Sequence, residues 1–527
     1  MTLRKKITRA LPYALMAAAY VLSVVFFALY GAHNINADDA SEMILAQQLN
    51  EEGKLLSENW LYSTELRIIS PVPLYQMGLK LFTSWHMART FAMGIVLLIV
   101  ILSSLFMMRR LELKKSAPWF ATVLALPFSG TYAYIVVFGC YYALHLSIAF
   151  IMLGLLCDFG RRGMESGKAQ FALLCLLALV SGLGGVRMMT MFIAPLIAAA
   201  ALLAAWEAKK EERFSAVAHE PPIRMFGASL GIAAFSAAGF LVNEVVLPKK
   251  YQYFTYADMT VGQFELSDVL HQISGMIRDL GYRTGKAFFS LGGIAALVTL
   301  GLFVLMLFAL VRLLMRWKDI GPEVRILAVT SVVAIALGMA LNILLNQIIT
   351  RYFLIGTILL IAAMFAWLET EPCKNAMLRT CALALVTFCF AFQAQNVLRY
   401  DYTIGRVNYE MTADWLLERG YTQGYATFWN ANTLTEASNG QIEMWVLEDG
   451  RRNAWMNLVL HDILQSKDHQ TRDPEGRVFL LVDEDQNKVD SPLLNPEHLV
   501  GEMVAWSYYV YEYDSVDEMR ALIAGNE

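Results

Sequence analysis

The sequence predicts a membrane protein built mostly of helices, with a small α/β domain at its C-terminal end. Of its 527 residues, 57% are hydrophobic and only 17% are charged, whereas soluble domains carry about a quarter charged residues. Apolar stretches of about 20 residues, long enough to cross a bilayer as a helix, recur along the first 398 residues. About eleven spans are predicted, at residues 11–31, 87–108, 117–136, 140–157, 169–186, 188–206, 225–247, 287–311, 326–345, 352–368 and 376–398.

The distribution of Lys and Arg orients this predicted polytopic bundle. If the N-terminus is cytoplasmic, 21 of the Lys and Arg residues before position 399 fall on inner segments and 11 on outer segments. Cytoplasmic loops are enriched in these residues, so a multi-pass plasma-membrane protein with a cytoplasmic N-terminus is expected. The first apolar run is longer than the apolar region of a signal peptide and is predicted to stay as a span. An odd number of spans then places everything after residue 398 outside.

The composition changes sharply after the membrane domain, residues 1–398. Residues 399–527 contain 23 acidic and 10 basic residues, a net charge of −13, against +9 for the first 398. All six cysteines precede residue 399, so no disulfide framework is expected in this extracytoplasmic domain. Its predicted elements are a helix in 405–420, strands at 441–447, 477–483 and 505–513, and a final helix at 515–525.

Two predicted outer segments, 32–86 and 248–286, are too long to be simple turns. Loops of this length usually bind ligands or act as lids. The first contains a predicted helix at 40–53. The second contains a predicted interfacial helix, whose apolar face is formed by Val269, Ile273, Met276, Ile277 and Leu280.

Two adjacent carboxylates, Asp38 and Asp39 in HNINADDASEM, follow the first span at its outer mouth. A carboxylate at this position can take a proton from an acceptor bound at the membrane surface. Asp39 and Glu42 also have the spacing of a helix capping box, which is a purely structural alternative. The sequence leaves both interpretations open.

Two arginines stand at outer ends of predicted spans. Arg351 opens the span that begins RYFLIG, and Arg187 follows the glycine-rich GLGG. A planar guanidinium suits a phosphate or diphosphate, so both are candidates for binding a phosphate group. Snorkelling toward lipid headgroups is the simpler alternative.

Further polar side chains near the same edge are candidates for substrate binding. His145 and Tyr142 lie in FGCYYALHL, Tyr352 follows Arg351, and Glu244 lies near the outer end of the seventh predicted span. Ionisable residues in spans are often functional. Ordinary packing explains His145 equally well, and Glu244 could simply mark the end of its span.

The basic N-terminus, the single span before Asp38-Asp39, the RYFLIG run and the later YATFWNANTLTEASNG together resemble the GT-C superfamily of membrane glycosyltransferases. The most similar branch is the bacterial relatives of protein O-mannosyltransferases and aminoarabinose transferases. RYFLIG lacks the proline that often follows Arg-Tyr in that branch, and the second acidic motif of some members is not evident.

The resemblance implies an enzyme that moves a sugar from a polyprenyl-phosphate donor to a glycan, lipid or protein acceptor on the outer face, with inversion. It assigns Asp38 as the general base, with Asp39 orienting the acceptor or helping to bind Mg²⁺ or Mn²⁺. Arg351 and Arg187 would stabilise charge on the leaving phosphate. No nucleic-acid partner is expected.

Other classes of function remain open from the sequence. A transporter or lipid flippase would be expected to carry charges at the membrane midplane, whereas the ionisable residues here gather at outer edges. A polysaccharide polymerase would depend on arginines in large outer loops. A non-catalytic scaffold would use the acidic domain and could dispense with Asp38 and Asp39.

Overall fold

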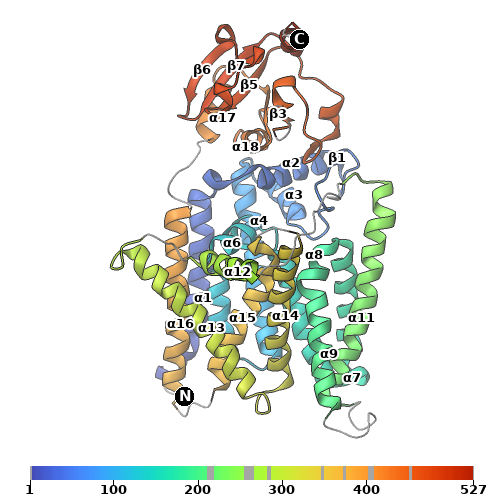
Figure 1. Cartoon of the computed structure of the whole chain (residues 1–527), viewed down its shortest axis with the longest axis vertical. Coiled ribbons are helices and arrows are strands. Elements are labelled where there is room, and N and C mark those ends of the chain that lie inside the picture. Colours follow the sequence, from blue (N-terminus) through green and yellow to red (C-terminus); the bar gives the residue numbers. More distant parts are fainter. Residues whose placement is uncertain are drawn as a thin grey trace.

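Long apolar helices lie side by side, and a small domain caps one end of the bundle, far from the N-terminus (Figure 1). This computed structural model describes residues 3–209, 219–253, 266–281, 286–345, 349–371, 375–401, 409–449 and 454–525.

Nine helices within these described ranges are long and apolar enough to cross a membrane. This confirms the predicted class, a multi-pass helical membrane protein. The nine lie in α1 (Leu3–Tyr30), α4 (Trp85–Arg110), α7 (Ala143–Leu183), α8 (Val186–Met188) with α9 (Ala194–Ala208), α11 (Pro221–Leu241), α13 (Leu291–Met315), α14 (Pro322–Leu344), α15 (Leu354–Thr370) and α16 (Ala376–Asp401).

Helix α7 accounts for one difference from the eleven predicted spans, because its chain reverses at Gly163. This glycine has φ 67° and ψ −174°, which is not helical. Gln170 Nε2 donates to Asp158 Oδ2 at 3.3 Å, although twelve residues of continuous helix would span about 18 Å. The predicted spans 140–157 and 169–186 therefore correspond to two antiparallel legs of α7.

The predicted span at 117–136 is not one continuous helix. Helix α5 (Ala117–Leu124) ends just before Pro127, and α6 (Gly130–Tyr132) follows after a break. Proline lacks the amide hydrogen that a continuing helix needs, and its ring clashes with the preceding turn. After the break, the chain returns toward the capped end of the bundle before α7 begins.

Three π-helical turns interrupt or extend membrane helices close to the capped end. They are η2 (Ala133–Phe138), η3 (Met189–Ile193) and η4 (Val242–Val246). Such turns are rare and occur frequently at functional sites. Each lies close in sequence to a residue singled out above: Tyr142, Arg187 or Glu244.

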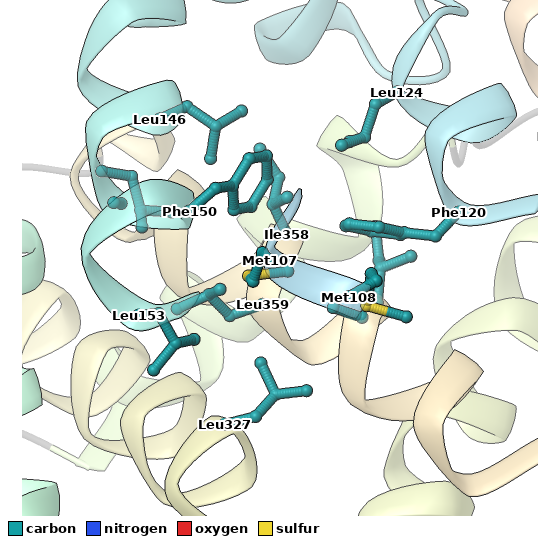
Figure 2. Packing of buried hydrophobic residues seen from close by; sticks show 14 of the residues in the cluster. Met107, Met108, Phe120, Leu124, Leu146, Phe150, Leu153, Leu327, Ile358 and Leu359 are labelled. Atoms are coloured by element: carbon teal, nitrogen blue, oxygen red, sulfur yellow. The ribbon is translucent and has the colours of Figure 1, made fainter. Parts of the chain in front are cut away.

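The centre of the bundle is a close-packed apolar core (Figure 2). Phe120 of α5 lies 6.0 Å from both Phe150 of α7 and Phe365 of α15, measured between ring centroids. Met107 and Met108 of α4 reach the same cluster. This core fixes the helices that carry the outer loops.

The segment predicted to be the first outer loop, 32–86, folds into helices that lie between the bundle and the cap (Figure 1). They are α2 (Ala37–Glu52) and α3 (Val72–Leu81). A two-residue strand of the loop, β1 (Trp60–Leu61), pairs antiparallel with β4 (Gln465–Ser466) of the C-terminal domain. The loop and the domain thus share a sheet.

The second outer loop contains α12 (Leu266–Asp279), which crosses the bundle near its capped end (Figure 1). Met276 and Leu280 are buried and Leu270 on the opposite side is exposed, so the predicted apolar face is the one that packs inward. Residues 254–265 and 282–285, which include part of the YQYFTYADM segment, lie outside the described residues.

The C-terminal domain is α/β, as predicted. Its five-stranded sheet has the order β3-β2-β5-β7-β6, in which β3, β2 and β5 are parallel and β7 is antiparallel to β5 and β6. The elements are α17 (Tyr409–Leu417), β2 (Gln423–Thr427), α18 (Phe428–Ala437), β3 (Glu443–Leu447), β5 (Val478–Asp483), β6 (Leu499–Val504), β7 (Tyr508–Tyr513) and α19 (Val516–Ala524).

Two glycines let α7 and α11 pack backbone to backbone. A Cβ atom on Gly182 would stand 2.0 Å from the carbonyl oxygen of Ser236, and one on Gly239 would stand 2.2 Å from that of Leu179. Small residues of this kind allow membrane helices to approach closely.

We therefore expect Gly182→Val to destabilise the protein by about 2 kcal/mol or more, because the added atoms force α7 away from α11. Thermal unfolding in detergent, followed by tryptophan fluorescence, measures the effect. The matched control is Gly227→Val on α11, where a Cβ meets no heavy atom within 4 Å. Equal melting temperatures for the two variants would contradict this account of the packing.

Candidate functional site

The acidic pair lies in the first turn of α2, not at its cap. Asn36 is the N-cap, and its Oδ1 accepts a hydrogen bond from the amide of Asp39 at 3.0 Å. The capping-box interpretation of Asp39 and Glu42 is therefore wrong. Neither aspartate therefore caps the helix. Because consecutive helical residues project about 100° apart, the two side chains point in different directions.

Asp39 is buried, with 5% of its surface exposed. Its Oδ1 has no hydrogen-bond partner among the described residues and borders a cavity of about 20 Å³ that Arg89 and Gly139 also line. This is room for about one water molecule. Burial raises the pKa of Asp39 to about 7, although the nearby Arg89 guanidinium acts in the opposite direction.

Gly139 makes this arrangement possible. A Cβ atom there would stand 3.0 Å from Asp39 Oδ1 and 2.4 Å from the carbonyl oxygen of Tyr134. Only a glycine lets the chain after η2 pass so close to the carboxylate.

Asp38 is partly exposed and has different neighbours. Burial raises its pKa above the usual range, and the charges of Arg67, Arg351 and His461 oppose the rise. These three residues come from the first outer loop, from the turn η6 (Thr350–Phe353) and from the C-terminal domain. The structure thus brings Asp38 and Arg351, 313 positions apart, into electrostatic reach.

A chain of alternating charges extends from α2 to Arg187. Arg67 Nε lies 3.1 Å from Glu42 Oε1, and Arg67 Nη1 lies 3.3 Å from Glu65 Oε1. The same Glu65 oxygen lies 2.7 Å from Arg187 Nη1. Arg187 therefore already has a carboxylate partner.

Arg351 differs from Arg187. It is exposed and, within the part of the chain that the structure describes, no carboxylate lies within salt-bridge distance of it. Its guanidinium lies 5.7 Å from the ring centroid of Tyr352. Of the two predicted phosphate-binding arginines, Arg351 is thus the one whose charge is available to a ligand.

The remaining sequence candidates divide into two groups. Tyr142 is buried beneath Arg187, whose guanidinium lies 4.7 Å from the ring centroid, and the His145 ring lies 5.6 Å from that of Tyr142. Tyr352 lies next to the Arg351 guanidinium, which is 5.7 Å from its ring centroid. Glu244 is exposed on η4, accepts a hydrogen bond from Asn243 Nδ2 at 3.0 Å, and has no described contact with Asp38 or Arg351.

Sequence reasoning missed a buried ion pair that joins the bundle, the acidic pair and the C-terminal domain. Arg89 of α4 is 1% exposed. Its Nε and Nη2 donate to the two carboxylate oxygens of Glu436 on α18 at 2.7 and 2.6 Å, and Nη2 also donates to the Asp39 carbonyl oxygen at 2.8 Å. The sequence did contain one signal for this pair, because Arg89 is an ionisable residue within the predicted apolar span 87–108, and such residues are often functional.

The tail segment YATFWNANTLTEASNG supplies Glu436 and further docking contacts. Asn439 Oδ1 accepts from the Trp85 amide at 2.8 Å, at the start of α4. Asn432 Nδ2 donates to the Leu464 carbonyl oxygen at 3.1 Å, beside β4. The polar residues of this segment thus hold the domain together and fix it on the bundle.

Among the described residues, one donor set could hold a divalent cation: Glu448, His461 and Asp462, with one ligand atom from each lying within 4.8 Å of the others. The predicted pair Asp38 and Asp39 is not part of it. Cationic neighbours surround both aspartates, Arg89 near one and Arg67 and Arg351 near the other, and they disfavour a metal ion held between the two.

Comparison with known proteins identifies the fold. No protein-family model and no curated protein sequence matches the chain. The crystal structure of ArnT from Cupriavidus metallidurans bound to undecaprenyl phosphate is similar over 95% of this chain and 97% of that one, with a TM-score of 0.58 and 12% identity.

Two more distant similarities have TM-scores below 0.5. The Archaeoglobus fulgidus oligosaccharyltransferase in the apo form matches over 82% of this chain and 64% of that one (TM-score 0.45, 13% identity). The arabinofuranosyltransferase AftD from Mycobacteria matches over 97% of this chain and 36% of that one (TM-score 0.44, 12% identity). The likeness to ArnT carries the assignment: the chain has the GT-C membrane fold with a C-terminal domain, as the sequence resemblance implied.

Glu436→Gln is expected to destabilise the docked domain by about 3–5 kcal/mol, because it leaves the Arg89 charge buried without its partner. The melting temperature and the rate of proteolysis between the bundle and the domain measure the effect. Glu443→Gln in the same domain is the matched control. Its carboxylate, which pairs with Arg472, is 42% exposed, and the change should cost about 1 kcal/mol or less. Equal effects would show that the buried pair does not hold the domain.

Proposed function

We propose that the protein is a glycosyltransferase that moves a sugar from a polyprenyl-phosphate donor to an acceptor at the capped end of the bundle. The observation that carries the proposal is the proximity of a partly exposed carboxylate, Asp38, to Arg351, which has no carboxylate partner among the described residues. The GT-C fold and the undecaprenyl phosphate bound to ArnT support a lipid-linked donor. The acceptor is a glycan, a lipid or a protein.

In this proposal Asp38 acts as the general base. As the acceptor hydroxyl oxygen attacks the anomeric carbon, its proton passes to Asp38, the bond from that carbon to the phosphate oxygen breaks, and the electron pair stays on the phosphate. Attack opposite the leaving group inverts the sugar carbon. Partial burial raises the pKa of Asp38, which makes its ionised form a stronger base.

The phosphate leaves with added negative charge, which Arg351 is placed to stabilise. Arg187, already paired with Glu65, would act more weakly. Tyr352 would line the same region, buried His145 would support Tyr142 from within the bundle, and Glu244 would contact substrate only at its periphery. Asp39 would help to orient the acceptor indirectly, by holding the first turn of α2, which carries Asp38.

The location of the charges supports an enzyme over a transporter. Asp38, Glu42, Glu65, Arg67 and Arg351 all lie in outer loops or turns and not in the middle of membrane helices. With the N-terminus cytoplasmic, as the distribution of Lys and Arg predicts, this rim faces outward, where lipid-linked sugars would be presented. The plasma membrane is the proposed location.

We expect Asp38→Asn to lower the rate of transfer by about 100-fold or more, because the acceptor hydroxyl loses its proton acceptor. Membranes containing each variant are assayed for transfer from radiolabelled polyprenyl-phosphate sugars. Glu51→Gln, an exposed carboxylate on the same helix, is the control and should retain full activity. Transfer that is indifferent to Asp38→Asn would remove the proposed base.

Arg351→Gln should lower kcat at saturating donor by about 100-fold, as expected when a charge that stabilises the leaving group is lost. Arg351→Lys keeps the positive charge but loses the planar guanidinium, so its kcat should lie between those of the unmodified protein and Arg351→Gln. Lys250→Gln, an exposed cation near the same rim, is the control. A change confined to the KM for the acceptor would contradict this role.

A further inference from the structure

A basic cavity lies at the end of the bundle opposite Asp38. Helix α4 begins at the C-terminal domain, where Trp85 meets Asn439, and its 26 residues end at Arg110, about 39 Å away. The cavity has a volume of about 650 Å³ and lies between this end of α4 and the reversal in α7. This is within the usual size range of ligand sites.

The cavity carries a surplus of positive charge. Five basic side chains line it, against the two carboxylates of Glu112 and Asp158, which leaves a net charge of +3. The basic residues are Arg109, Arg110, Lys114, Arg161 and Arg162.

One buried carboxylate orients three of these arginines. Asp158, whose side chain is 5% exposed, lies 3.2 Å from Arg110, 3.4 Å from Arg161 and 3.2 Å from Arg162. A single negative charge cannot neutralise three guanidinium groups. Glu323 Oε1 also pairs with Arg161 Nη1 at 3.1 Å. The two carboxylates together hold the three arginines in place and still leave a surplus of positive charge for an external anion.

The charge of Arg109 is less compensated than the charges of the neighbouring arginines. Its Nη2 donates to the hydroxyl of Tyr13 at 3.2 Å, and within the described ranges no carboxylate lies within salt-bridge distance of it. A guanidinium presents several donors in a plane and matches the oxygens of a phosphate group.

The other wall of the cavity is apolar and opens toward the bilayer. Leu102, Leu105 and Phe106 of α4 line it. Leu102 is 54% exposed, and Leu98 one turn earlier is 41% exposed. On a helix whose outer face is surrounded by lipid, these side chains form an apolar path leading from the basic cavity into the hydrocarbon region.

We propose that this cavity binds the phosphate headgroup of an anionic phospholipid, with an acyl chain lying along Leu102 and Leu98. The positive-inside distribution of charge accounts for basic residues at this end of the bundle. It does not account for a concave site, for arginines fixed by a buried aspartate, or for an apolar wall that joins them to the lipid-facing surface. The site is remote from Asp38 and independent of the proposed reaction.

Native mass spectrometry of the purified full-length protein in detergent tests the proposal. The protein is titrated with phosphatidylglycerol and, separately, with phosphatidylcholine. Arg109→Gln with Arg162→Gln should weaken phosphatidylglycerol binding by about 30-fold, from ~1 kcal/mol for each basic residue near an anionic headgroup. The control removes two exposed cations from the same end but outside the cavity, Lys168→Gln with Lys318→Gln, and should bind as the unmodified protein does.

Each outcome decides the question. A selective loss in the cavity variant, with inorganic phosphate failing to displace the lipid, supports the proposal. Equal losses in both variants, equal binding of the two lipids, or complete displacement by millimolar inorganic phosphate overturns it. If the double variant does not fold, Arg109→Gln alone, which among the described side chains loses the contact with Tyr13, should still weaken binding about fivefold.

Discussion

The buried pair between Arg89 and Glu436 is the interaction on which the rest of the capped end of the bundle depends. Both side chains are almost completely removed from water. Such a pair is tolerated only when geometry is good and further hydrogen bonds satisfy the remaining donors. Here the Asp39 carbonyl oxygen and the Tyr75 hydroxyl supply them. The membrane bundle, the first turn of α2 and the C-terminal domain are therefore fixed relative to one another at one point.

This anchorage explains how two adjacent aspartates come to have different environments. Arg89 and Gly139 enclose Asp39, while Asp38, rotated by about 100° on the same turn, faces His461, Arg67 and Arg351. The C-terminal domain contributes to both environments, through Glu436 on one side and His461 on the other. The acidic domain, whose role the sequence left open, thus contributes residues to the candidate site.

Local patterns allowed the spans, the main strands of the tail and the apolar face of α12 to be predicted, because hydropathy and periodicity are properties of neighbouring residues. The reversal at Gly163 and the break at Pro127 needed conformations that hydropathy does not report. Arg89 and Glu436 are separated by 347 positions, and no pattern along the chain could pair them. Strand β2 and helix α18 were missed because the chain turns directly from one into the other, without a loop to mark the boundary.

Arg187 and Arg351 show why position alone could not rank the candidate site. Both stand at the predicted outer end of a span, so the sequence makes both of them candidates. In the fold, Glu65 neutralises Arg187 through an ion pair at 2.7 Å, while Arg351 keeps its charge unpaired among the described residues beside Asp38. Among the described residues, Arg351 and Asp38 lie within electrostatic reach but are not joined by a salt bridge. This is the arrangement that the proposed reaction would use, in which Arg351 would stabilise the leaving phosphate and Asp38 would receive the proton.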